Sequence, residues 1–183
     1  MKSITLLIPV YNEESVLPQL FSRLDELAKS TPNYQFEFLF INDGSIDESL
    51  SIITNQAQKD TRISYINLSR NFGKEIAMLA GIDHAKGDAA VIIDADLQDP
   101  PELIKEMIAY WEDGYDDIYA RRSSRQGETW LKKKTSQWYY RILQKSTSIP
   151  IQINTGDFRL LDRRCIEALR QFRESQRNTK AIF

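Results

Sequence analysis

The stretch Ala89–Pro101, with the sequence AAVIIDADLQDPP, joins an apolar run to a cluster of acids. A nearly continuous apolar run over 89–94 is typical of a strand buried on both faces of a parallel sheet. The carboxylates of Asp94 and Asp96 follow where this strand ends, and the two prolines then open a helix, because proline is tolerated in a helix's first turn. This succession of buried strand, polar turn and helix predicts an α/β fold.

The same succession recurs on both sides of this stretch. Strand-like apolar runs alternate with segments whose apolar residues are spaced three and four apart, as in amphipathic helices. We predict further strands over 4–8, 36–41, 63–68, 117–120 and 158–161, and helices over 13–29, 74–85, 130–143 and 162–172, with two more helices ending near 58 and 111. This order favours a three-layer α/β/α sandwich with a mostly parallel sheet, formed by one domain over 1–183.

The charge of the chain is unevenly distributed. The 183 residues carry a net charge of −2, but residues 1–120 hold 9 Lys/Arg against 21 Asp/Glu, a net of −12, and residues 121–183 hold 15 against 5, a net of +10. Such asymmetry indicates an anionic partner for the basic part, or alternatively a solvated basic surface. The longest apolar runs fall short of the ~20 residues that a membrane helix needs. A single cysteine, Cys165, excludes an internal disulfide and is compatible with a reducing cytosol.

Polar segments follow the first four predicted strands, at 9–14, 42–45, 69–74 and 94–99. Parallel strands bring their carboxyl ends to one edge of a sheet, where open α/β sheets bind their ligands. Each segment alone would be a turn with a helix cap. The four together, at the same edge, indicate a binding site.

The acids after residue 93 predict a metal site. In an extended chain side chains alternate between faces, so Asp94, Asp96 and Gln98 would point the same way. Two carboxylates and an amide oxygen are hard ligands suited to Mg²⁺ or Mn²⁺, and the cation would remove the repulsion between the acids. The alternative is that these acids are solvated and that Asp99 caps the next helix. We accept that alternative for Asp99 but favour the metal for Asp94 and Asp96.

Other common chemistries lack their residues. There is neither GxGxxG after the first strand nor GxxxxGK[ST], which argues against dinucleotide and P-loop sites. The only histidine, His84, lies within a predicted helix with no nucleophile motif around it. A Ser-His-Asp or Cys-His device is therefore not expected.

Three of the polar segments resemble one known family. The sequences of 9–14, 42–45 and 94–101 resemble family 2 glycosyltransferases with the GT-A fold. Together with the segment 69–74, these sequences resemble the polyprenyl-phosphate branch of that family, which includes dolichol-phosphate mannose synthases and bactoprenol glucosyltransferases. The resemblance extends from about 4 to 164.

The resemblance implies a role for particular residues. It places the nucleotide-sugar donor, with its base, ribose and diphosphate, against Pro9, Tyr11, Glu13, Asp43, Lys74, Asp94, Arg121, Arg125 and Arg159. It places Mg²⁺ or Mn²⁺ on Asp94 and Asp96, with Gln98 as a further ligand. In the segment 155–160 it gives Asp157 the position of a base, so that Asp157 and Asp96 are the expected catalytic residues.

The activity implied is inverting, metal-dependent transfer of a hexose from a nucleotide diphosphate sugar to polyprenyl phosphate. The resemblance favours UDP-glucose over GDP-mannose, with 1–120 binding the nucleotide and 121–183 facing the acceptor. A phosphate monoester is already largely dianionic at neutral pH, its second pKa being about 6, so Asp157 would orient this acceptor or bind metal. A hydroxyl acceptor would need Asp157 as a general base.

The same resemblance implies a location at the cytoplasmic face of the membrane, in contact with anionic lipid, and no nucleic-acid partner. Because such relatives continue into membrane helices, we expect the chain to be the catalytic domain of a longer, membrane-anchored protein that contributes to cell-envelope glycans. Two alternatives stay open: a soluble glycosyltransferase that acts on a saccharide hydroxyl, and a non-catalytic module that binds nucleotide sugar or docks on membranes. The sequence indicates no oligomeric state.

Overall fold

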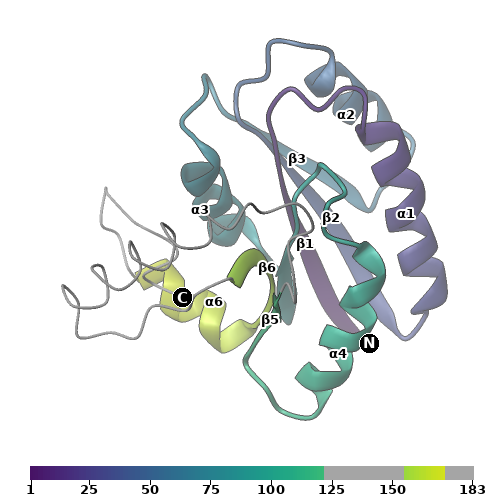
Figure 1. Cartoon of the computed structure of the whole chain (residues 1–183), viewed down its shortest axis with the longest axis vertical. Coiled ribbons are helices and arrows are strands. Elements are labelled where there is room, and N and C mark those ends of the chain that lie inside the picture. The colour runs from purple at the N-terminus through teal and green to yellow at the C-terminus, as the bar shows by residue number, and fades with distance from the viewer. Residues whose placement is uncertain (122–154, 172–183) are drawn as a thin grey trace, which may run out of the picture.

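Strand β1 lies inside a six-stranded sheet in the computed structural model, which describes residues 1–121 and 155–171. Helices alternate with the first five strands along the chain (Figure 1). The elements are β1 (Lys2–Val10), α1 (Leu17–Ser30), β2 (Tyr34–Asn42), α2 (Ser49–Ala57), β3 (Ile63–Asn67), α3 (Lys74–His84), β4 (Ala89–Ile92), η1 (Pro101–Leu103), α4 (Ile104–Glu112), β5 (Asp117–Arg121), β6 (Thr155–Asp162) and α6 (Arg163–Gln171).

The sheet is mostly parallel, as the sequence predicts. Its strand order is β3-β2-β1-β4-β6-β5, and β1 pairs in parallel with both β2 and β4. Strand β6 is the exception, because it inserts between β4 and β5 and runs antiparallel to both. The start of β6 therefore lies at the edge where β4 and β5 end.

Two apolar cores cover the two faces of the sheet. One core packs α1, α2 and α4 against one face, and the other packs α3 and α6 against the opposite face. Figure 1 shows α1 and α4 on one side of the sheet and α3 and α6 on the other. These layers confirm the predicted α/β/α sandwich. No helix within the described parts of the chain is long and apolar enough to cross a membrane.

The strand predicted over 89–94 ends earlier than expected. Strand β4 stops at Ile92 rather than at 94, and residues 95–98 form turns and bends. Leu97 has a φ of 60°, a left-handed conformation that interrupts the alternation expected of an extended chain. The expectation that 94–98 continues as an extended segment is therefore wrong. The helix predicted over 130–143 lies outside the described residues.

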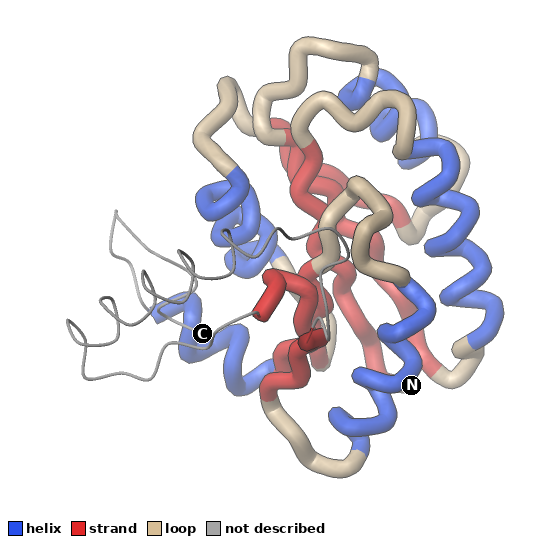
Figure 2. Tube along the Cα trace, in the orientation of Figure 1, coloured by secondary structure: helices blue, strands red, loops and turns tan. Residues whose placement is uncertain are grey.

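The loops that follow β1, β2, β3 and β4 gather at one end of the sheet (Figure 2). Two of them touch at Gly44, which has a φ of +67°. A Cβ at this position would lie 2.3 Å from the carbonyl carbon of Arg70, so only glycine allows the loop after β2 to approach the loop after β3 this closely. This contact brings the polar segments of two strands together.

We expect Gly44→Ala to destabilise the protein more than Gly114→Ala. Both glycines have a positive φ, but a Cβ at Gly114 would meet no atom within 4 Å. Gly114→Ala should therefore cost only the left-handed backbone strain, about 1 kcal/mol, whereas Gly44→Ala adds a backbone clash and should cost about 3 kcal/mol. Urea unfolding of the two variants measures the difference, and equal losses would contradict the close approach.

Candidate active site

A pocket of about 290 Å³ opens at the carboxyl end of the parallel strands. Residues from the loops after β1, β2, β3 and β4 line it together. They are Pro9, Val10, Tyr11, Glu13, Asp43, Asn71, Gly73, Lys74, Asp94, Ala95 and Asp96. The structure thus brings together most of the residues that the sequence predicts for nucleotide and metal.

The carboxylate of Asp43 fixes the start of α3. It is 3% exposed and accepts hydrogen bonds from the backbone N–H groups of Phe72, at 2.8 Å, and Gly73, at 2.9 Å. A buried carboxylate between two N–H donors is satisfied and holds both in place. Since Lys74 follows directly as the first residue of α3, Asp43 also sets where the lysine side chain begins.

The ammonium of Lys74 joins the two acids that the sequence assigns to metal binding and catalysis. Its Nζ lies 2.6 Å from Oδ1 of Asp94 and 2.7 Å from Oδ2 of Asp157. The antiparallel pairing explains this meeting, because Ile92 of β4 pairs with Arg159 of β6, and Asp94 and Asp157 each lie two residues beyond this last pair at the same end of the two strands.

Negative charge accumulates in the pocket. Burial raises the pKa of Glu13, and the carboxylates of Asp96, Asp47 and Asp94 raise it further. Burial also raises the pKa of Asp94, despite the opposing effect of Lys74. The neighbouring acids therefore disfavour the ionised forms of Glu13 and Asp94, as expected where carboxylates converge with too few cations.

The donor set fits a divalent cation that is shared with a ligand. Within the described residues there is no group of three or more Asp, Glu, His or Cys side chains able to hold a metal. Asp94 and Asp96 both line the pocket, and Mg²⁺ is commonly bound by one or two carboxylates together with substrate phosphates. Gln98 is exposed and outside the lining, and its backbone N–H donates to Oδ1 of Asp96 at 3.0 Å.

The three predicted arginines are placed differently. Arg159 is 3% exposed, and its Nη1 bonds Oδ2 of Asp117 at 3.1 Å, away from the pocket lining. Its guanidinium also lies 5.9 Å from the centre of the Tyr119 ring, and burial lowers its pKa. Arg121 ends β5, and Arg125 lies outside the described residues.

Four lining residues, Val10, Asn71, Gly73 and Ala95, are absent from the site residues predicted by sequence, and Asn71 and Gly73 are the two that follow β3. The side-chain oxygen of Asn71 accepts the Gly73 N–H at 2.9 Å, and Gly73 has a φ of 94°. The signal that could have found them is the segment 69–74 itself, where a glycine and an asparagine precede the lysine.

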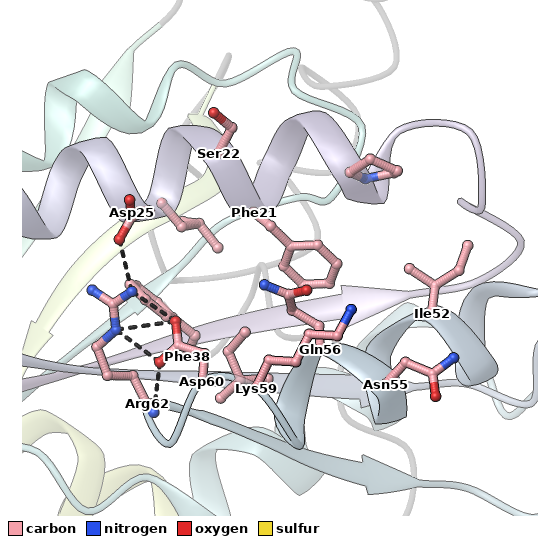
Figure 3. A pocket seen from close by; sticks show the side chains of 13 residues that line it. Phe21, Ser22, Asp25, Phe38, Ile52, Asn55, Gln56, Lys59, Asp60 and Arg62 are labelled. Atoms are coloured by element: carbon pink, nitrogen blue, oxygen red, sulfur yellow. Dashed lines mark hydrogen bonds and ion pairs between the residues drawn. The ribbon is translucent and has the colours of Figure 1, made fainter.

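A larger hollow of about 810 Å³ lies between α1 and α2 over β2 and β3 (Figure 3). It contains none of the predicted site residues. Its guanidinium, Arg62, donates to Asp25 at 2.8 Å and to Asp60 at 2.6 Å, so its charge is already matched (Figure 3). We therefore place the candidate active site in the smaller pocket.

Comparison with known proteins identifies relatives of this chain. Residues 5–170 match the model of glycosyl transferase family 2. An uncharacterized glycosyltransferase of Synechocystis sp. is 49% identical over 98% of this chain and 56% of its own length. The bactoprenol glucosyl transferase of Shigella phage SfV is 42% identical over 98% of this chain and 58% of its own length.

Among solved structures, the mannosyltransferase PcManGT from Pyrobaculum calidifontis, in complex with GDP-Man and Mn²⁺, has a TM-score of 0.64. It is 19% identical and covers 91% of this chain and 46% of that protein. This likeness confirms the predicted GT-A fold. The chain spans little more than half the length of the curated relatives it matches.

We expect Glu13→Gln to stabilise the protein at pH 7 and not at pH 4. The folded-state pKa of Glu13 lies above its ordinary value of 4.5, so its ionised form destabilises the fold above that pKa and the effect disappears once the group is protonated in both states. Solvent screening limits the gain to about 0.5 kcal/mol.

Urea unfolding with EDTA at both pH values measures this effect. The exposed Glu26→Gln on α1 is the matched control and should change little at either pH. A loss of stability in Glu13→Gln at pH 7 would contradict the crowding of acids in the pocket.

Proposed function

The chain belongs to glycosyl transferase family 2, and from this premise we propose that it transfers a hexose from a nucleotide diphosphate sugar to polyprenyl phosphate. The transfer inverts the anomeric centre and uses Mg²⁺ or Mn²⁺. UDP-glucose is the favoured donor, in keeping with a relative that is named a bactoprenol glucosyl transferase. The curated relatives are longer than this chain, so the activity is a proposal for the whole protein.

One observation carries the proposal. Asp94 and Asp157, which are far apart in sequence, meet at the ammonium of Lys74, and Asp96 lines the same pocket as Asp94 and Lys74. A donor diphosphate is a polyanion, so a site for it needs cations, whereas this pocket holds mainly carboxylates. A divalent cation reconciles the two sets of charges.

The donor would lie along the pocket lining. Pro9, Tyr11, Glu13 and Asp43 would face its base and ribose, since they come from the loops after β1 and β2. Lys74 would meet the diphosphate, together with Arg121 and Arg125. Arg159 would influence the donor phosphates through its charge and not by direct contact, because its guanidinium is buried against Asp117 outside the pocket lining.

Asp94 and Asp96 would hold the cation, with Gln98 at its margin. When bound, this ion supplies charge neutralisation to the leaving nucleoside diphosphate. The chain's own part is to keep two carboxylates at the pocket wall.

Asp157 would orient the acceptor rather than remove a proton from it. A polyprenyl phosphate oxygen is already ionised at neutral pH, because the second pKa of a phosphate monoester is about 6. The residues 1–120 would then bind the nucleotide, and the basic residues 121–183 would face the acceptor phosphate and anionic lipid at the cytoplasmic face of the membrane.

Transfer can be tested with UDP-[¹⁴C]glucose and polyprenyl phosphate in detergent. We expect radioactivity in the organic phase after lipid extraction. Label on an added saccharide, in the aqueous phase, would instead support a hydroxyl acceptor. Donor binding without any product or hydrolysis would support a non-catalytic module.

We expect Asp96→Asn to lower the transfer rate by roughly a hundredfold or more, because it removes one of the two carboxylates proposed to hold the cation. EDTA should do the same to the wild type, with recovery on adding Mn²⁺. Asp83→Asn, an exposed acid on α3, is the matched control. Full activity of the wild type in EDTA would overturn the metal assignment.

We expect Asp157→Asn to keep transfer to polyprenyl phosphate within about tenfold of wild type. A general base contributes about 10²–10⁴-fold, so a loss of that size would show that Asp157 does remove a proton. The initial rate at saturating donor and acceptor is the measurement.

A further inference from the structure

We propose that Lys74 is an internal counter-cation that occupies the carboxylates of Asp94 and Asp157 until metal and donor diphosphate arrive together. The inference rests on the proposed function and concerns the order in which the same site is filled. Its consequence is that a divalent cation alone binds weakly and that the nucleoside diphosphate tightens its binding.

The first support is the number of oxygens that the ammonium engages. Nζ of Lys74 lies 2.6 Å from Oδ1 and 2.8 Å from Oδ2 of Asp94, and 2.7 Å from Oδ2 of Asp157. Both oxygens of Asp94 are thus occupied. A metal ion that takes Asp94 as a ligand has to compete with the ammonium for them.

The second support is that the acids need a cation at this position. Asp94 follows the end of β4 and Asp157 lies in β6, and their carboxylates meet at the same Nζ, 2.6 and 2.7 Å away, so two like charges lie close together and disfavour each other. Lys74 supplies the missing positive charge. It is also the only Lys or Arg among the described residues that line the pocket.

The third support is that this cation is able to move. The side chain of Lys74 is 39% exposed, whereas that of Asp157 is 16% exposed, so the lysine faces the open pocket and the acid lies behind it. A lysine ammonium is a point charge on a flexible four-carbon stem, and it needs no fixed planar geometry. It can leave the acids for another anion nearby without rebuilding the backbone.

Through Lys74, the binding of the divalent cation is coupled to the binding of the nucleoside diphosphate. A cation arriving alone competes with the ammonium for Asp94 and places a second positive charge beside it, whereas a cation arriving with a diphosphate brings negative charge that can pair with both. Each ligand therefore favours the other, and the coupling is reciprocal. The lysine acts as a positioning residue for the empty site and as a diphosphate contact in the filled one.

Mn²⁺ titration of the chain, followed by the EPR signal of free Mn²⁺, tests this with and without UDP. We expect wild type to bind Mn²⁺ weakly alone and more tightly with UDP. Lys74→Met should bind Mn²⁺ alone about tenfold tighter than wild type, a typical size for coupling between ligands, and UDP should tighten it less. A purely structural role for Lys74 would not raise metal affinity.

The controls separate charge, size and folding. Lys86→Met removes an exposed lysine outside the pocket and should behave as wild type. Lys74→Arg keeps the charge and should retain weak binding of Mn²⁺ alone. Lys74→Gln is the second neutral variant should Lys74→Met fail to fold, and the same tightening is expected of it.

The outcomes distinguish this inference from the proposed function. Mn²⁺ binding by wild type with UDP, but no tighter binding by the neutral Lys74 variants without UDP, overturns the counter-cation alone. Absence of Mn²⁺ binding by wild type even with UDP overturns both the metal assignment and the inference. Tighter binding by the neutral variants with little change in Lys86→Met supports it.

Discussion

The antiparallel pairing of β6 with β4 is the constraint on which the site depends. If β6 ran in the parallel direction, its start would lie at the opposite edge of the sheet, and Asp157 would be remote from Asp94. The observed pairing brings two acids to one place, which is unfavourable by itself. The ammonium of Lys74, from a helix on one face of the sheet, makes it acceptable, so the strand pairing and the ion pair are parts of one arrangement.

A second set of contacts determines where that ammonium begins. Asp43 directly follows β2, and its buried carboxylate accepts hydrogen bonds from two backbone N–H groups of the loop before α3. Gly44 lets the same two loops meet. The lysine is therefore held at its backbone end by strand β2 and at its tip by β4 and β6. Only its flexible stem is free, which places any motion in the side chain rather than in the fold.

The sequence could predict the layers and the edge at which ligands bind, because both follow from local apolar periodicity and from the polar segments after each strand. It could not predict the insertion of β6 between β4 and β5, because the partner of a strand depends on the whole sheet. Alternation failed after Ile92, where Leu97 adopts a left-handed backbone. The burial of Arg159 could not be predicted from the sequence either, because its partner Asp117 lies on another strand.

The two hollows described above differ in electrostatic balance as well as in size. In the larger one, between α1 and α2, the guanidinium of Arg62 is matched by the carboxylates beside it. In the smaller one, Glu13, Asp94 and Asp96 line the wall with a single ammonium among the described lining residues, and burial together with neighbouring acids raises the pKa of Glu13 and of Asp94. A hollow whose charges are matched gains little from an added ion. A hollow with unmatched acids is stabilised by an added cation. The unmatched acids, rather than the volume, therefore mark the smaller pocket as the place where a cation and a phosphate ligand would bind.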